Sequence, residues 1–206
     1  MKKKLRIINI DGTEGLGKTT QVSMLVNFLK SKNIPYKIIH LEDNVESAGE
    51  ACEKTIEFLE KTPKGVVISD GSIARMMVID LLSNIHRDKI TQKYEKMIHD
   101  YEVLGHKYGV ANILLVLEDT KEASNRVIKR EKLLGNVSSG ILSEFIEKDI
   151  IKALKNFNIY TLSQQIVFDV IKVDTNDSII EVNGNIINYL NENFEIESPS
   201  EEGDLS

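Results

Sequence analysis

A chain of 206 residues has the usual length of one domain, and its 41% of hydrophobic and 28% of charged residues are typical of a soluble globular protein. It contains no run of about 18 apolar residues, so we expect no membrane span. The formal net charge of −6 provides no general attraction for nucleic acid, and the single cysteine, Cys52, excludes an internal disulfide. Because too few apolar residues follow the basic start to make a secretory signal, we expect a cytoplasmic protein.

Strand-like and helix-like patterns alternate along the chain. Short apolar runs predict buried strands at residues 5–10, 36–41, 65–70, 112–117 and 170–173. Helical spacing of apolar residues predicts helices at residues 18–30, 47–60, 72–82, 88–107, 121–132, 141–156 and 178–190. Strands separated by helices imply a three-layer α/β fold, with a parallel sheet of about five strands and helices on both faces.

The chain is predicted to form one domain over residues 1–193. Residues 194–206 carry five acidic residues and no base, together with serine, proline and glycine. Such a composition is typical of segments that do not fold. We therefore expect an acidic, disordered tail from residue 194 onward.

The first predicted strand leads into a glycine-rich turn, Gly12-x-x-x-x-Gly17-Lys18-Thr19, and a helix follows. This is the pattern and the context of a phosphate-binding P-loop. Glycines permit backbone angles at which successive N–H groups point at phosphate oxygens, aided by the helix N-terminus. Lys18 is predicted to reach the β- and γ-phosphates, and the Thr19 hydroxyl to bind Mg²⁺. The residues predicted to hold the nucleotide are Gly12, Thr13, Glu14, Gly15, Leu16, Gly17, Lys18, Thr19 and Thr20.

The wider run at residues 11–21, DGTEGLGKTTQ, resembles the loop of thymidylate kinases. An acid–Gly–x–acid–Gly–x–Gly–Lys–Thr/Ser–Thr–Gln run is typical of that family, and Glu14 and Gln21 match it in addition to the P-loop residues. The resemblance extends more weakly to about Leu190. It implies the P-loop NTPase fold and a kinase of nucleotide biosynthesis, which transfers the γ-phosphoryl group of ATP, with Mg²⁺, to a deoxynucleoside monophosphate, dTMP giving dTDP. We also assign Asp11 to substrate binding.

The third predicted strand ends at Asp70, and the carboxyl ends of parallel strands meet at one edge of a sheet. In thymidylate kinases this strand ends in an Asp-Arg pair. The aspartate helps to hold the Mg²⁺ shell, and the arginine grips the acceptor phosphate. The resemblance therefore implies a metal and substrate role for Asp70, but Gly71 stands in the arginine's place. Arg75, one helical turn onward, is a candidate for binding that anion; the alternative is an exposed helical arginine.

The segment between the second and third predicted strands is acidic and is shorter than in thymidylate kinases. Carboxylates repel a monophosphate and suit hydroxyl groups. Deoxynucleoside kinases, a related class, use a carboxylate near this place to accept the proton of the sugar hydroxyl. Glu42, or its neighbour Asp43, is therefore a candidate substrate-binding residue; a solvated loop is the alternative.

Residues 115–130, LVLEDTKEASNRVIKR, resemble the fourth strand and the basic lid helix of the family. Arg126 and Arg130 are spaced i, i+4 and project from one helix face. The resemblance implies that they are catalytic and donate to the charged oxygens of the transferring group; a solvated basic helix is the alternative. A polar, glycine-flanked stretch then suits a mobile lid at about residues 131–142.

Asp174 lies before the last predicted helix. In the family the corresponding loop lies beside the adenine ring and contacts it through its backbone. An alternative is that this segment caps the helix, with Asp177 before Ser178, and both can hold together. The four histidines show no metal-ligand spacing, so ordinary packing is expected for them.

Two other functions stay open at this level. A kinase with the same donor site could act on a nucleoside or modified-nucleotide hydroxyl, which Gly71 and the acidic segment favour. A catalytically impaired ATP-binding protein of the same fold would also show an intact loop beside an altered acceptor side. For a kinase of a nucleotide or of a nucleoside, the partner is a small-molecule acceptor. Family analogy also implies a homodimer.

Overall fold

The computed structural model describes residues 2–12, 15–40, 45–71, 99, 103–117, 122, 125–126, 128–129, 133 and 170–198. Several predictions fall outside these residues: those on Thr13, Glu14, Glu42, Arg75 and Arg130, those on the helices at 72–82 and 141–156, and those on the lid apart from residue 133. Within the described part of the chain, no helix is long and apolar enough to cross a membrane.

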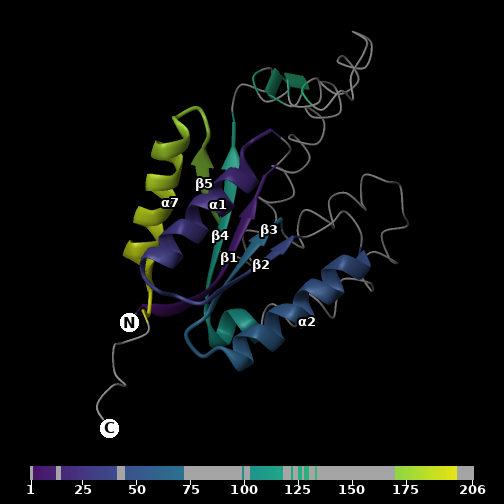
Figure 1. Cartoon of the computed structure of the whole chain (residues 1–206), viewed down its shortest axis with the longest axis vertical. Helices are drawn as coiled ribbons and strands as arrows, with labels where there is room; N and C mark the ends of the chain where they lie inside the picture. Colours follow the sequence, from purple (N-terminus) through teal and green to yellow (C-terminus); the bar gives the residue numbers. More distant parts are fainter. Residues whose placement is uncertain are drawn as a thin grey trace.

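The centre of the molecule is a parallel sheet (Figure 1). Its main strands are β1 (Lys3–Asp11), β2 (Tyr36–His40), β3 (Val66–Asp70), β4 (Gly109–Val116) and β5 (Val170–Asp174), in the order β2-β3-β1-β4-β5. This confirms the predicted α/β fold and its five-stranded parallel core. Because β2 and β3 lie on one side of β1 and β4 and β5 on the other, the strand order switches at β1. Ligands of open parallel sheets bind at such a switch point, outside the carboxyl ends of the strands.

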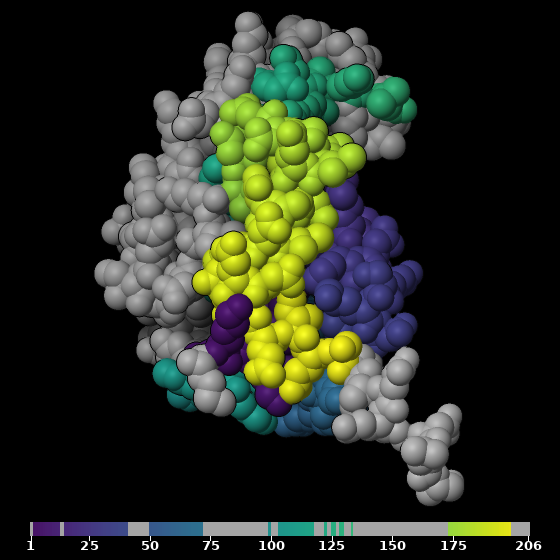
Figure 2. Space-filling view, turned by 90° about the vertical axis from the view of Figure 1, so that its left-hand side faces the viewer, coloured from purple at the N-terminus to yellow at the C-terminus, as the bar shows by residue number. Residues whose placement is uncertain are grey.

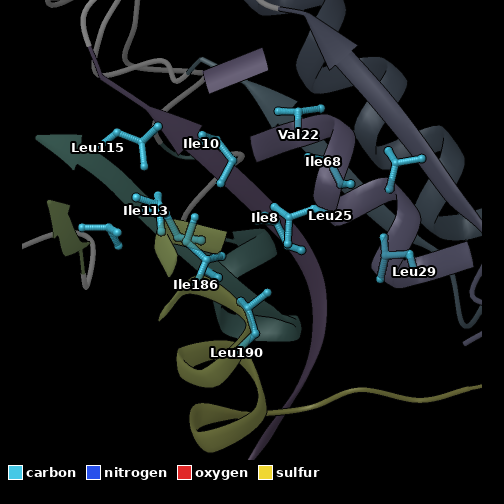
Figure 3. Close-up of a cluster of buried hydrophobic side chains, with 14 of the residues drawn as sticks. Ile8, Ile10, Val22, Leu25, Leu29, Ile68, Ile113, Leu115, Ile186 and Leu190 are labelled. Carbon is cyan, nitrogen blue, oxygen red and sulfur yellow. The ribbon is translucent and has the colours of Figure 1, made fainter. Parts of the chain in front are cut away.

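Helices α1 (Lys18–Ser31) and α7 (Ile179–Asn193) cover one face of the sheet, and α2 (Val45–Lys61) covers the other (Figure 1). Side chains alternate between the two faces of a strand, so Ile8 and Ile10 of β1 face α1 and α7 and form the main core with them. Figure 3 shows this cluster between the sheet and the two helices. In Figure 2, α7 (green to yellow) runs along one face of the molecule beside α1 (indigo).

Strand β4 begins at Gly109, before the start of the apolar run that predicted it. The strand packs so closely against β1 here that a Cβ on Gly109 would lie 2.6 Å from the Lys4 carbonyl oxygen. It would also lie 2.8 Å from the Phe194 ring. Only glycine permits this approach, and a glycine at a strand end is easily taken for a turn in the sequence.

Replacing Gly109 by alanine is expected to lower the free energy of unfolding by about 2 kcal/mol, because the added methyl group meets backbone that cannot move aside. Urea unfolding followed by circular dichroism measures this change. Gly105→Ala is the matched control, since a Cβ on Gly105 meets nothing within 4 Å. Equal stability of the two variants would contradict the close approach.

The end of the described chain differs from the prediction of a disordered tail from residue 194. Phe194 and Glu195 form a short strand, β6, that pairs in parallel with Lys3 and Lys4 of β1. The Phe194 ring meets Tyr189 edge to face at 5.9 Å, and Glu197 forms an ion pair with Lys4 that raises the pKa of the lysine. The predicted boundary is therefore wrong for residues 194–197, because their apolar side chains pack on the core while only their average composition is tail-like. Residues 199–206 lie outside the described residues.

Candidate active site

The glycine-rich loop follows β1 at the switch point of the sheet. Gly12, Gly15 and Gly17 all have positive φ angles, of 140°, 80° and 84°, which side-chain-bearing residues rarely adopt. A Cβ on Gly12 would lie 2.9 Å from the Leu115 carbonyl oxygen, so the loop is also pressed against β4. Gly17 is the N-cap of α1, and a glycine has no side chain with which to cap the helix. The first N–H groups of α1 point out of this helix end, in the orientation that binds anions.

The residues predicted to hold the phosphates lie, where the structure describes them, in this loop or in the first turn of α1; these are Gly12, Gly15, Leu16, Gly17, Lys18, Thr19 and Thr20. Asp174, which is also predicted to bind the nucleotide, lies at the end of β5. Leu16 differs from the others because its side chain is only 2% exposed and belongs to the core. It therefore anchors the loop, and only its backbone can face a ligand. Asp11 is also buried, and its carboxylate accepts the Gly12 N–H at 2.7 Å. The carboxylate thus shapes the entry to the loop, while its role in substrate binding stays a prediction.

Thr19 and Asp70 come together from different elements. The Thr19 hydroxyl, on the first turn of α1, donates a hydrogen bond of 3.0 Å to Asp70 Oδ2, at the end of β3. Hydroxyl and carboxylate oxygens are the hard ligands that Mg²⁺ prefers. A hydroxyl that donates its proton keeps lone pairs for a cation, so both residues can bind one ion without separating. The pair fits the predicted Mg²⁺ site, which remains a prediction.

Gly71 follows Asp70 with a φ of 107°. Its N–H donates to the Ile10 carbonyl at 2.8 Å, and its own carbonyl accepts from the Ser69 hydroxyl at 2.9 Å. The glycine that stands where the resemblance expects an arginine therefore occupies a turn that an arginine would enter only with strain. The positive φ of residue 71 explains the presence of glycine in place of the expected arginine more directly than the loss of a positive charge does.

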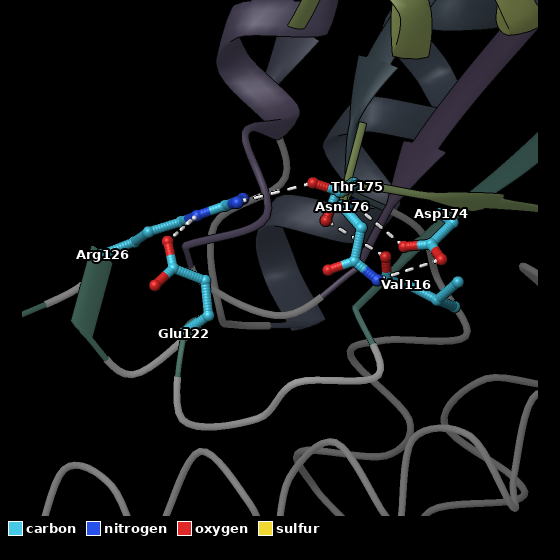
Figure 4. Close-up of polar contacts among 6 residues, drawn as sticks. All are labelled: Val116, Glu122, Arg126, Asp174, Thr175 and Asn176. Carbon is cyan, nitrogen blue, oxygen red and sulfur yellow. Dashed lines mark hydrogen bonds and ion pairs between the residues drawn. The ribbon is translucent and has the colours of Figure 1, made fainter. Parts of the chain in front are cut away.

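The loop between β5 and α7 is held by its own side chains (Figure 4). Asp174 accepts hydrogen bonds from the Asn176 backbone at 2.9 Å and from the Asn176 amide at 3.2 Å. Thr175 donates to the Val116 carbonyl from its N–H at 2.8 Å and from its hydroxyl at 3.1 Å. The Asp174 carboxylate is thus engaged in shaping the loop, which leaves the backbone to meet a ligand, as the resemblance implies.

Arg126 lies against this same loop (Figure 4). Its Nε donates to Glu122 Oε1 at 3.0 Å, and its Nη2 reaches the Thr175 carbonyl at 3.5 Å. The predicted lid arginine is therefore joined to the β5–α7 loop. These two contacts use two of the five N–H donors of the guanidinium. Donation by the remaining N–H groups to a transferring phosphoryl group, and with it the catalytic role of Arg126, stays a prediction.

Gln21 has a structural role that sequence reasoning missed. Its side chain is 3% exposed, donates to the Ile179 carbonyl at 3.2 Å and accepts from the buried Asn183 amide at 3.0 Å. It thereby joins α1, which follows the phosphate loop, to α7, which follows the β5–α7 loop. The glutamine at the end of the DGTEGLGKTTQ run was the available signal, but nothing in the sequence identifies its partners.

Helix α7 begins with a capping box, in which Ser178 and Glu181 each accept the other's backbone N–H. Ser178, and not Asp177, is therefore the N-cap. The hydrogen bonds from Ser178 lower the pKa of Glu181 below the ordinary value of a glutamate. A carboxyl group with a lowered folded-state pKa stabilises the fold above its unfolded-state pKa, and this stabilisation is lost as the pH falls through the folded-state value.

We therefore expect Glu181→Gln to remove part of the acid sensitivity of the protein. Between pH of about 4.5 and 3, the wild type should lose more thermal stability than the variant, because only the wild type must protonate a carboxylate that accepts hydrogen bonds. Thermal unfolding at a series of pH values measures the difference. Glu192→Gln, on the exposed end of α7, is the control; a pH dependence of Glu181→Gln equal to that of wild type would show that the box contributes nothing.

Comparisons with known proteins are consistent with this arrangement. No family model matches the chain. A thymidylate kinase from Carboxydothermus hydrogenoformans (strain ATCC BAA-161 / DSM 6008 / Z-2901) is 37% identical over 68 residues, which are 33% of this chain and 31% of that protein. The match thus spans about a third of either protein.

Solved structures match over most of the chain. Deoxyadenosine kinase from M. mycoides with bound dATP superposes with a TM-score of 0.53 at 19% identity, covering 90% of this chain and 99% of that one. The same kinase with bound dCTP gives a TM-score of 0.52 at 20% identity, with the same coverage. These comparisons confirm the resemblance to thymidylate kinase-like nucleotide kinases and the predicted P-loop fold.

Proposed function

We propose that this protein is an ATP- and Mg²⁺-dependent kinase that phosphorylates a deoxynucleoside monophosphate or a deoxynucleoside. The observation that carries the proposal is the meeting of the glycine loop, the N-terminus of α1 and the Thr19–Asp70 pair at the switch point of the sheet. This combination offers backbone donors for phosphates and oxygen ligands for a divalent cation in one place. By family analogy we also propose a cytoplasmic homodimer.

The protein's contribution to the reaction would be positioning and charge neutralisation. The loop N–H groups and Lys18 would hold the β- and γ-phosphates, and Thr19 and Asp70 would hold Mg²⁺, which when bound neutralises phosphate charge. The β5–α7 loop would receive the adenine ring through its backbone, with Arg126 beside it. The acceptor oxygen then forms a bond to the γ-phosphorus as the bond to the β-phosphate oxygen breaks, and ADP leaves.

The acceptor has two candidates, each favoured by a different observation. The 37% match to a thymidylate kinase favours dTMP, whose phosphate oxygen is already a nucleophile and needs no base. Gly71, with a φ of 107°, stands where the resemblance expects the arginine that grips the acceptor phosphate, and this favours a deoxynucleoside. In that case the hydroxyl proton would pass to a carboxylate such as Glu42, as the acidic segment suggests.

A panel of acceptors with radiolabelled ATP tests the proposal. We expect label on dTMP or on one of the four deoxynucleosides, dependent on added Mg²⁺. Transfer to dTMP alone would select the first candidate, and transfer to a nucleoside alone would select the second. ATP binding without labelling of any acceptor would overturn the kinase proposal in favour of a binding protein of the same fold.

Placing an arginine at position 71 provides a second test of the acceptor side. Gly71→Arg is expected to cost about 1–3 kcal/mol of stability, because a residue with a side chain must take up a positive φ. It should not improve the KM for dTMP, since the turn and not the missing charge determines the geometry. Gly71→Ala is the control for strain alone; a tenfold lower KM for dTMP in Gly71→Arg would contradict this explanation.

A further inference from the structure

One histidine lies beside the candidate metal site and is not explained by packing. His40 is the last residue of β2, and Asp70 is the last residue of β3; the two are paired in the parallel ladder. Paired residues of neighbouring strands project from the same face of a sheet. His40 Nδ1 lies 3.5 Å from Asp70 Oδ2, the oxygen that also accepts the Thr19 hydroxyl.

The exposed fractions of the two side chains indicate which of them is held in place by the contact. The His40 side chain is 64% exposed, so it buries little apolar surface and contributes little to the core. The Asp70 side chain is 12% exposed, so most of its surface is covered by neighbours. A largely exposed imidazole against a largely covered carboxylate is an arrangement that orients the carboxylate.

We propose that His40 is a positioning residue for the divalent cation of the bound nucleotide. The imidazole, whose Nδ1 lies 3.5 Å from Asp70 Oδ2, keeps the carboxylate beside Thr19, so that the two oxygen ligands remain together. This inference rests on the proposed function, because it assigns a task within the ATP and Mg²⁺ site. It does not depend on the charge of the imidazole, since an Nδ1–H is present both in the imidazolium and in one neutral tautomer.

The effect of losing this contact follows from the role of groups that hold metal ligands. Without His40, the Asp70 carboxylate keeps, among the described residues, the hydrogen bond from the Thr19 hydroxyl. If the Asp70 carboxylate is not held in place beforehand, binding of the cation must also order it, and this lowers the affinity for the cation. Removing a contact that supports a metal ligand typically costs about 10- to 100-fold in metal affinity. The affinity for ATP in the absence of metal should not change, because His40 is not part of the phosphate loop.

Three variants separate this role from a general effect of substitution. His40→Ala removes the donor, while His40→Asn retains an N–H close to the position of Nδ1. His106→Ala removes an exposed histidine from the helical residues 103–107, at a distance in sequence from the site, and is the control. Binding of ATP to the full-length protein is measured by calorimetry, first in EDTA and then at increasing MgCl₂ concentrations, so that no turnover is required.

We expect His40→Ala to need about 10-fold more MgCl₂ for half-maximal tightening of ATP binding, with unchanged ATP affinity in EDTA. His40→Asn should lie within about threefold of wild type, and His106→Ala should equal wild type. Equal MgCl₂ dependence of His40→Ala and wild type would overturn the inference, as would a His40→Asn variant as impaired as His40→Ala. If the affinity of the wild type for ATP does not respond to MgCl₂, the proposed function itself fails. This outcome differs from failure of the His40 inference, in which only the variant and the wild type are equal.

Discussion

Replacing Lys18 by alanine is expected to lower kcat/KM for ATP by about a thousandfold. Lys18 is the first residue of α1 and follows Gly17, whose positive φ lets the chain wrap around a phosphate group. An ammonium group at this point would neutralise charge that grows on the β- and γ-phosphate oxygens during transfer. Removing one such preorganised donor typically costs about 10²- to 10³-fold in rate.

Steady-state kinetics with the acceptor identified by the labelling panel measures this effect, and circular dichroism checks the fold. Lys30→Ala is the matched control, because Lys30 is an exposed lysine in the last turn of the same helix. We expect the control to retain wild-type kcat/KM. A Lys18→Ala enzyme within tenfold of wild type would mean that transfer does not take place at the glycine loop.

Arg6→Ala is expected to lower the free energy of unfolding by about 3 kcal/mol. Arg6 is 7% exposed, and its guanidinium lies over the Tyr108 ring, 5.0 Å from the ring centroid. It donates to four carbonyl groups at and after the end of α2, those of Leu59 (3.1 Å), Thr62 (2.7 Å), Pro63 (2.6 Å) and Gly65 (2.6 Å). The last carbonyls of a helix have no partner within it, so Arg6 satisfies groups that burial would otherwise leave unpaired.

The cost of burying the charge is visible in Arg6 itself, since burial lowers the pKa of its guanidinium, which nevertheless stays protonated. For a chain of this size, 3 kcal/mol corresponds to a fall in Tm of about 6–12 °C. Arg6→Lys should recover only part of the loss, because a lysine lacks the planar fork that reaches several carbonyls at once.

Lys3→Ala is the control for Arg6, because Lys3 on the same strand donates to one carbonyl, that of Gly105, from an exposed position. We expect its effect to be below about 0.5 kcal/mol. Scanning calorimetry compares the variants. An Arg6→Ala protein as stable as Lys3→Ala would show that water satisfies the helix end as well as the arginine does.

Sequence reasoning was most successful where the signal is local. The phosphate loop could be predicted because its glycines, lysine and threonine are consecutive, and their backbone angles follow from residue type. The strands of the sheet could be predicted because each contains a short apolar run, and in β1 and β3 that run has adjacent apolar residues because both faces are buried. The start of β4 was missed because Gly109 is required by the approach of β1, which no local pattern records.

The contacts that sequence reasoning missed join residues far apart in the chain. Gln21 meets Ile179 and Asn183, and Arg6 meets the end of α2. Nothing in the sequence indicated that the fold buries the charged side chain of Arg6. Likewise the composition of residues 194–197 indicated disorder, but pairing with β1 orders them.

The sequence by itself determined the α/β alternation, the loop after β1 and the residue types that suit a nucleotide and Mg²⁺, because all of these depend on neighbours along the chain. Only the tertiary structure decided that Thr19, Asp70 and His40 meet at one point, since they come from α1, β3 and β2 and are brought together by strand order. It also decided that Gly71 occupies a turn with a φ of 107° and that Arg126 rests on the β5–α7 loop. The physical reason is that a backbone angle or a hydrogen-bond partner is set by packing between elements, whereas periodicity and glycine placement are set within them.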